Sequence, residues 1–179
     1  MTWTAPKTMG SEIGTSSDWN TYVRDNELYL KSIVDGVSFS GVQLTRTAAT
    51  SIGDTSETTI TWTAEPFDYG GWWSSGTNIV VPAGAIPSGF TTIALAVNAR
   101  TKFAASGTGA RRIKVKKNGT EFGSASLSGV AGETIDLTIP EVVTVVSGDI
   151  LIFTVYQTSG GNLDVSQTQI SVYRIAPVV

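Results

Sequence analysis

The sequence predicts a mainly β fold, a jelly-roll sandwich preceded by a short N-terminal coiled-coil helix. Residues 15–36 carry seam positions at alternating spacings of four and three, the pattern of a coiled coil. From residue 37 onward, short β-branched and aromatic stretches alternate with turns rich in Gly, Pro, Ser and Thr. The stretch 148–161, GDILIFTVYQTSGG, is apolar on both alternating faces and has turn residues at each end, which is typical of a strand covered on two sides.

The composition favours a binding or structural protein over an enzyme. The 179 residues suit one domain plus an appendage, and only 15% of them are charged, against about 25% in an average soluble domain. A net charge of −3 gives no reason to expect a nucleic acid or a membrane as partner. The absence of Cys and His removes disulfides, imidazole ligands and the usual general base. We therefore predict no enzymatic activity, no cofactor, no metal and no membrane insertion.

The N-terminal segment, residues 1–36, is predicted to be an arm followed by a helix. Residues 1–14 have no periodic pattern and leave Trp3 in water unless they dock on a larger body; the alternative is a frayed terminus. The helix begins near residues 15–18, TSSD, whose side chains can cap the first amide groups, and Gly36 can end it. The seam of this helix consists of Trp19, Val23, Asn26, Leu30 and Ile33.

This seam predicts self-association through the helix. A helix of about 18 residues is roughly 27 Å long and holds about two and a half heptads, so the coil is marginal alone and needs the mass that follows it. Asn26 within the seam can set the number of strands and their register. The alternative is that the helix packs on its own domain.

Residues 37–179 are predicted to form one β domain. Their segments are short and no helical period recurs, so the spacing indicates about eight to ten strands, as in a sandwich or jelly roll. The expected strands are 42–47, 58–63, 78–81, 90–103, a hairpin over 111–127, then 134–139, 142–146, the strand within 148–161, and 165–175. An aromatic cluster, FDYGGWW, occupies residues 67–73.

The sequence predicts the type of turn in the hairpin. Asn118-Gly119 supplies two residues that tolerate the positive φ of a type I′ turn. Asn118-Gly119-Thr120 also fits the N-glycosylation pattern, but the turn is the preferred interpretation. On the first strand of the hairpin Ile113 and Val115 are expected to face inward.

The same strand places basic side chains outward. Seven of the twelve basic residues lie within 100–117, and no acidic residue interrupts them. Lys114 and Lys116 are therefore candidate contacts for a polyanion such as a teichoic acid or surface polysaccharide. The alternative is a solvated outer face that charge protects from aggregation.

The aromatic cluster has two interpretations. Tyr69 and Trp72 are candidate sugar-stacking residues, because flat rings cover the apolar face of a pyranose while the neighbouring carboxylates of Glu65 and Asp68 accept its hydroxyls. The alternative is that these rings lie in the core or in a subunit interface. Two acids three positions apart do not by themselves indicate a glycosidase.

The strand within 148–161 predicts a subunit interface. Alternation places Ile150, Ile152 and Tyr156 on one face and residues 151, 153 and 155 on the other. A sandwich normally leaves one face of each sheet in water, and each exposed large apolar side chain forgoes roughly 1.5 to 3 kcal/mol of burial. We therefore expect Ile150, Ile152 and Tyr156 to meet a neighbouring subunit.

Two resemblances extend this interpretation. Residues 90–175, with Phe67-Asp68 and Trp73, the strand RRIKVKKNG, the stretch SGDILIFTVYQTSGG and the closing strand SVYRI, resemble the trimeric jelly-roll heads of the complement-subcomponent and tumour-necrosis-factor superfamily, particularly versions found in bacteriophage virion proteins. WTAPKT followed by SSDWNTYVRDNELYLK is similar to the opening of many phage tail and minor structural proteins. The first resemblance implies a homotrimer, and the second implies that residues 1–36 attach a distal head to other virion proteins.

Together these observations predict a bacteriophage virion structural protein that is made in the host cytoplasm. We expect a homotrimeric tail-tip or fibre-type protein that displays its jelly-roll head for host-surface contact. Two alternatives stay open: a capsid decoration or head-fibre protein, and a free carbohydrate-binding module.

Overall fold

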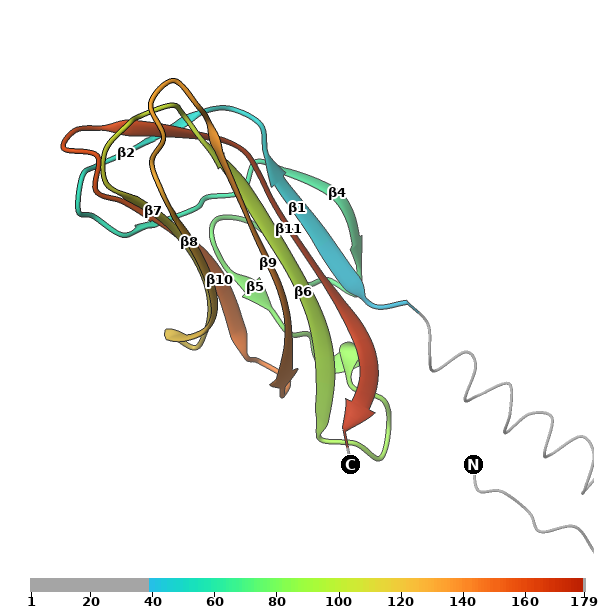
Figure 1. The fold of residues 1–179 in the computed structure, drawn as a ribbon. Helices are drawn as coiled ribbons and strands as arrows, with labels where there is room; N and C mark the ends of the chain where they lie inside the picture. Colours follow the sequence, from blue (N-terminus) through green and yellow to red (C-terminus); the bar gives the residue numbers. More distant parts are fainter. Residues whose placement is uncertain (1–38, 179) are drawn as a thin grey trace, which may run out of the picture. The chain divides into compact units, whose positions relative to one another are not determined.

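The computed structural model describes residues 39–178, which belong to one compact unit that begins at Phe39. The predicted arm, the coiled-coil helix and the seam residues Trp19, Val23, Asn26, Leu30 and Ile33 lie outside the described residues. Within the described residues, two antiparallel sheets face each other (Figure 1). No helix among them is long and apolar enough to cross a membrane.

Strands make up most of this unit. In chain order they are β1 (Gly41–Arg46), β2 (Thr50–Ile52), β3 (Thr58–Thr59), β4 (Ala64–Tyr69), β5 (Ile79–Val80), β6 (Thr92–Phe103), β7 (Ala110–Lys117), β8 (Thr120–Ser128), β9 (Ile135–Val145), β10 (Ile150–Gln157) and β11 (Leu163–Val178). A short 3-10 turn, Ala83–Ala85, lies between β5 and β6.

The strand order is that of a jelly roll. The first sheet, which we call sheet A, runs β4-β1-β11-β6-β9, with β2 paired to β11. The second, sheet B, runs β3-β10-β7-β8, with β5 paired to β10. Strands distant in sequence are neighbours in both sheets, as two Greek keys require. The mainly β fold and the predicted jelly-roll sandwich are therefore confirmed.

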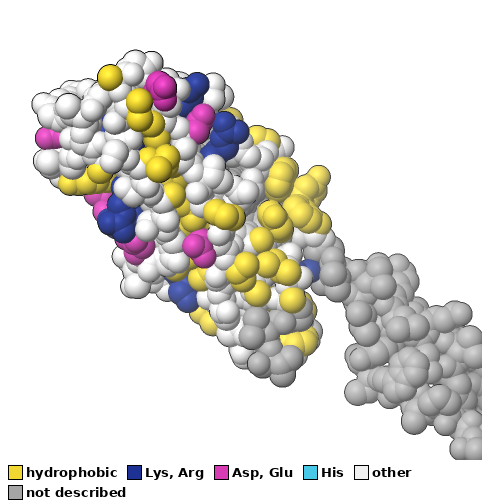
Figure 2. All heavy atoms as spheres, viewed as in Figure 1, with side chains coloured by type: hydrophobic (Ala, Val, Ile, Leu, Met, Phe, Trp, Pro, Cys, Tyr) yellow, Lys and Arg dark blue, Asp and Glu magenta, His cyan; other side chains and the backbone are white. Residues whose placement is uncertain are grey.

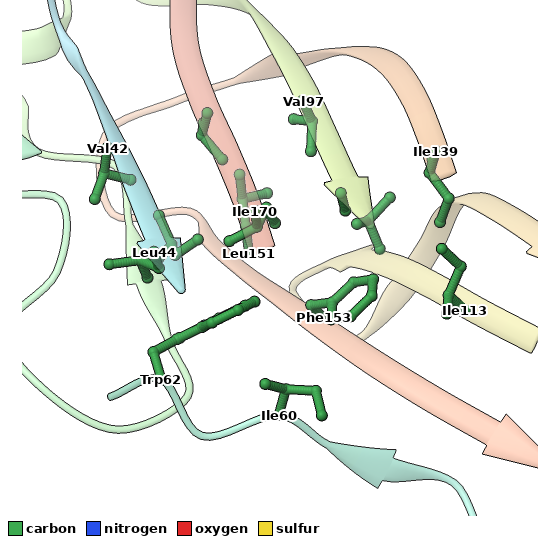
Figure 3. Close-up of a cluster of buried hydrophobic side chains, with 14 of the residues drawn as sticks. Val42, Leu44, Ile60, Trp62, Val97, Ile113, Ile139, Leu151, Phe153 and Ile170 are labelled. Carbon is green, nitrogen blue, oxygen red and sulfur yellow. The ribbon is translucent and has the colours of Figure 1, made fainter. Parts of the chain in front are cut away.

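The core lies between the two sheets. The inward residues of β10, Leu151, Phe153 and Val155, are buried, as the alternation of this strand predicts. Phe153 stacks on Trp62 with ring centroids 6.0 Å apart. Figure 3 shows Leu151 and Phe153 in one cluster with residues from sheet A such as Leu44. Apolar burial of this kind is the main source of stability for the sandwich.

Two expected boundaries change in the structure. The predicted strands 134–139 and 142–146 form one continuous strand, β9, which pairs with β6 through Pro140 opposite Asn98. A proline is tolerated there because β9 is the edge of sheet A and has one side free of strand partners. The aromatic cluster also begins in a strand that the sequence did not predict, because β4 hydrogen-bonds to β1.

The predicted hairpin is confirmed. Strands β7 and β8 pair with Lys117 opposite Thr120, which leaves Asn118 and Gly119 as a two-residue loop. Their φ angles are 50° and 84°, as a type I′ turn requires.

The two faces of β10 are expected to respond differently to truncation. Leu151 is 1% exposed and Ile150 is 36% exposed. Leu151→Ala should lower the free energy of unfolding by about 2 to 5 kcal/mol, because it leaves a cavity in the core, and Ile150→Ala by less than about 1 kcal/mol. Equilibrium denaturation in urea measures both losses. Equal losses would contradict a half-exposed Ile150 and would indicate that another subunit covers it.

Candidate functional site

The outer face of sheet A carries a row of uncharged residues that crosses all five of its main strands. The register aligns Tyr69 of β4, Gly41 of β1, Tyr173 of β11, Ala96 of β6 and Val142 of β9. Residues in register share one face of a sheet. Large exposed side chains therefore alternate along this row with Gly and Ala.

One end of this row is an aromatic patch, which we define as Phe39, Phe67, Tyr69 and Tyr173. The ring of Phe39 lies 5.7 Å from Phe67, 5.6 Å from Tyr69 and 6.4 Å from Tyr173. Despite these contacts, Phe39 is 56% exposed, Tyr69 59% and Tyr173 39%. Figure 2 shows hydrophobic side chains gathered on this side of the head. Exposed apolar groups that cluster in this way usually mark an interaction site.

The chain enters the patch through a fixed junction. The Ser40 hydroxyl oxygen accepts a hydrogen bond from the buried Trp72 indole N–H at 3.1 Å, and the Ser40 carbonyl accepts one from the Arg174 amide at 2.9 Å. Next to it, a Cβ added at Gly41 would lie 2.8 Å from Tyr173 Cα, so only glycine fits there. The position of Phe39 is therefore set by bonds and packing on both sides of β1.

Asp68 organises the aromatic cluster. Its Oδ1 accepts hydrogen bonds from the amides of Gly71 at 3.0 Å and Trp72 at 2.9 Å, and its Oδ2 accepts one from Trp73 at 2.9 Å. This turn sends Trp72 into the core, where it is 0% exposed, while Tyr69 stays at the surface. The proposed sugar contact at Trp72 is thus corrected, because a fully buried ring cannot stack on a ligand. Tyr69 keeps the exposure that such a contact needs.

A hollow of about 460 Å³ lies beside the aromatic patch on the same face. Its walls are Ala96, Val97, Asn98, Pro140, Glu141, Val142 and Tyr173. The small side chain of Ala96 leaves the space, and Val142 at its rim is 64% exposed. The lining is mostly apolar, with Asn98 and Glu141 as its polar side chains other than the Tyr173 hydroxyl. The described residues contain no cluster of three or more metal-ligating side chains.

The outer face of sheet B has the opposite character. Lys114 donates a hydrogen bond to Glu57 at 2.7 Å, and Lys116 pairs with the other oxygen of Glu57. Glu121 joins the same network through Arg112 at 2.7 Å and Lys114 at 3.6 Å. The predicted polyanion contacts Lys114 and Lys116 therefore share a carboxylate partner within the chain, and their contact with a polyanion stays a prediction. Sequence analysis missed this because Glu57 lies 57 positions before Lys114.

The Glu57 carboxylate responds strongly to these lysines. Burial alone would raise the pKa of Glu57. The hydrogen bonds from Lys114 and Lys116 outweigh burial and lower the pKa from its ordinary value to about 2. The carboxylate is therefore ionised at any pH at which the protein is expected to work.

The rest of the basic run does not form one ribbon. Arg111 points into the sandwich and is 0% exposed, where its guanidinium donates to the carbonyls of Ser106, Thr108 and Ala110. Arg100 belongs to β6 in the other sheet. A run that is continuous in sequence is thus divided between two sheets and the core.

The predicted interface residues of β10 lie on this charged face. Ile152 and Tyr156 are half-buried and stand opposite Lys116 and Arg112, while Ile150 is at the exposed end of the strand. Their contact with another subunit stays a prediction.

Comparison with solved structures gives the same architecture. The globular domain of zebrafish complement 1qA protein matches with a TM-score of 0.56 and 8% identity over 78% of this chain and 99% of that chain. Murine APRIL at pH 5.0 matches with a TM-score of 0.56 and 15% identity over 77% of this chain and 100% of that chain. These likenesses show a C1q- and TNF-like jelly-roll fold. No protein-family model and no curated protein matches the sequence.

The charge network on sheet B predicts a specific acid response. Because the folded-state pKa of Glu57 is about 2 and the unfolded value is about 4.3, its ion pairs contribute stability above about pH 4.3 and lose it as the pH falls toward 2. Glu57→Gln should lower the free energy of unfolding by about 1 kcal/mol at pH 6, a modest value because solvent screens exposed pairs. The difference in free energy of unfolding between Glu57→Gln and wild type should vanish as the pH approaches about 2.

Urea denaturation at several pH values measures this difference. Glu133→Gln is the matched control, because Glu133 carries the same charge in an exposed loop. A constant difference between wild type and Glu57→Gln across the acid range would contradict the assigned ion pairs.

Proposed function

We propose that this chain is a non-enzymatic bacteriophage virion protein that assembles as a homotrimer and displays its jelly-roll head for host-surface contact from a tail tip or fibre. The observation that carries the proposal is a pair of adjacent uncharged, partly aromatic rows on the outer face of sheet A. A second copy of the chain is the partner that covers this face. Three lines of argument support that assignment.

The first is the distribution of charge. The row through Tyr69 and Val142 and the next row on the same face contain no charged residue; that next row consists of Phe67, Gln43, Ser171, Asn98 and Pro140. The cores of subunit interfaces are depleted of charge and enriched in aromatic residues. Sheet B presents a network of lysines, arginine and glutamates instead. Sheet A is therefore the better interface, and it replaces the β10 face as the favoured contact.

The second is the energy of exposure. Phe39, Tyr69 and Tyr173 each keep more than a third of their surface in water within one chain. Covering large apolar side chains contributes about 25 cal/mol for each square ångström removed from water. The hollow next to them offers space into which a side chain of another copy can pack. Association on this face thus gains apolar burial, and Glu141 is the one charged residue among those that line the hollow.

The third is chain continuity. Gly36, the predicted end of the coiled-coil helix, precedes Phe39 by three residues. Self-association through the seam of that helix would raise the local concentration of the domains that follow it and so favour their contact. The resemblance of residues 1–36 to openings of phage tail proteins supports attachment of this end to other virion proteins and display of the head.

Association is expected to depend on sheet A. Val142→Arg places a charge in the hollow, and because Val142 is 64% exposed the single chain can still fold. The full-length variant should sediment as a smaller species than wild type at the same concentration, since an unpaired charge in an interface costs several kcal/mol. Sedimentation velocity over a dilution series measures this change.

Val80→Arg is the matched control, because Val80 is 41% exposed on β5 of sheet B. It should leave the wild-type sedimentation unchanged. Dissociation by Val80→Arg alone would move the interface to sheet B and to the predicted residues Ile150, Ile152 and Tyr156. A monomeric wild-type protein would favour the free carbohydrate-binding module.

The location on the particle needs a separate experiment. Antibody against the head, bound to intact phage and imaged by electron microscopy, should label the tail tip or fibres and should block infection. Label on the capsid would support the capsid decoration or head-fibre protein instead. Particles that contain no copy of the chain would contradict the virion assignment.

A further inference from the structure

Two turns at one end of the sandwich are joined by side-chain and backbone hydrogen bonds. The Asn118 amide group donates from Nδ2 to Asp149 Oδ1 at 2.7 Å, and its Oδ1 accepts the Ile150 amide at 2.9 Å. The Asn118 backbone amide donates to the Ile150 carbonyl at 2.8 Å. We call this arrangement the Asn118 clasp. It holds both polar atoms of the Asn118 side chain at once.

Asp149 is itself firmly placed. It is 8% exposed, and its Oδ2 accepts the Val146 amide at 2.9 Å while Lys117 Nζ lies 3.9 Å away. Burial alone would raise the pKa of Asp149. The hydrogen bonds from Val146 and Asn118 and the charge of Lys117 outweigh burial, so the pKa lies below its ordinary value. An ionised carboxylate is a strong acceptor, so its bond to the Asn118 amide is charge-assisted.

Asn118 is also the residue of this chain whose sequence context best suits spontaneous deamidation. It precedes Gly119 in the only Asn-Gly pair of the sequence, and both residues are exposed to water. Gly119 has no side chain to hinder its own nitrogen. That nitrogen can attack Asn118 Cγ, a C–N bond forms, and the side-chain nitrogen leaves as ammonia. Water then opens the resulting succinimide to aspartate or isoaspartate, so no other reactant is needed.

We propose that Asn118 is a deamidation site whose rate is set by the clasp with Asp149. Attack by Gly119 requires the Asn118 side chain to rotate until Cγ meets that nitrogen. Rotation breaks the bonds at Nδ2 and Oδ1 together, and Asp149 also holds the nitrogen that must leave. The folded head therefore slows a reaction that its turn sequence favours.

The product would weaken the same end of the sandwich. A carboxylate at position 118 cannot donate to Asp149, and two carboxylates at that distance repel each other. Isoaspartate also lengthens the backbone within a two-residue turn whose φ angles are fixed at 50° and 84°. Deamidation at Asn118 is thus a one-way change that loosens the turns between β7 and β8 and between β9 and β10.

Peptide mapping by mass spectrometry tests the proposal on the full-length chain. Wild type incubated at pH 8 should deamidate at Asn118 more slowly when folded than when unfolded in urea. Asp149→Ala should speed the folded-state reaction about tenfold, the factor that one charge-assisted hydrogen bond is worth. Asp54→Ala is the matched control, because Asp54 also accepts a backbone amide, that of Gly160 at 2.9 Å, at a different turn.

The control should destabilise the protein without changing the rate at Asn118. Equal rates in folded and urea-unfolded wild type would overturn the proposal, and this comparison needs no variant to fold. Acceleration by Asp54→Ala to the same extent as by Asp149→Ala would also overturn it, because the cause would then be general unfolding. Asn118→Asp carries the product in advance and should melt at a lower temperature than wild type at pH 7.

Discussion

The placement of β11 between β1 and β6 is the constraint on which the rest of the head depends. This strand, Leu163–Val178, pairs with β1, β2 and β6 and therefore fixes the register of sheet A. Because Gly41 lies against Tyr173 with no room for a side chain, the start of β1 is held close to β11 at Tyr173. The uncharged row from Tyr69 to Val142 exists only because these strands, distant in sequence, meet in this order.

The two outer faces of the sandwich divide the surface chemistry between them. Sheet B keeps Ile152 and Tyr156 half-covered beneath an ion-pair network, and exposed ion pairs of this kind contribute only about 0 to 1 kcal/mol each. Their value lies in keeping that face soluble and resistant to edge-to-edge association. Sheet A has no such network over Tyr173 and Val142 among the residues described. The fold thus leaves one outer face with an ion-pair network and the other with two adjacent uncharged rows.

Local patterns in the sequence predicted the parts that local rules determine. The alternation in β10 identified Leu151, Phe153 and Val155 as the buried side. The pair Asn118-Gly119 identified the turn between β7 and β8. Pairings across long sequence separations were not accessible. Glu57 contacts Lys114 because β3, which follows Glu57, pairs with β10. Trp72 lies in the core because Asp68 accepts a hydrogen bond from its amide and so fixes the turn before it. For this reason the sequence predicted a subunit contact on β10, whereas the contact we propose lies on sheet A.

Two buried polar side chains, Arg111 of β7 and Gln157 of β10, bind carbonyls of the neighbouring loops. Arg111 has no carboxylate partner among the described residues and bonds instead to carbonyls such as that of Ser106. Burying a guanidinium is costly, and an unpaired buried carbonyl is costly as well, so each of these hydrogen bonds offsets part of both costs. Gln157, equally buried, bonds to the carbonyls of Ile52 and Gly161 in the same way. With these loops held by such anchors, any association of the chain would lose less conformational entropy in them, because their order would not have to be created on binding.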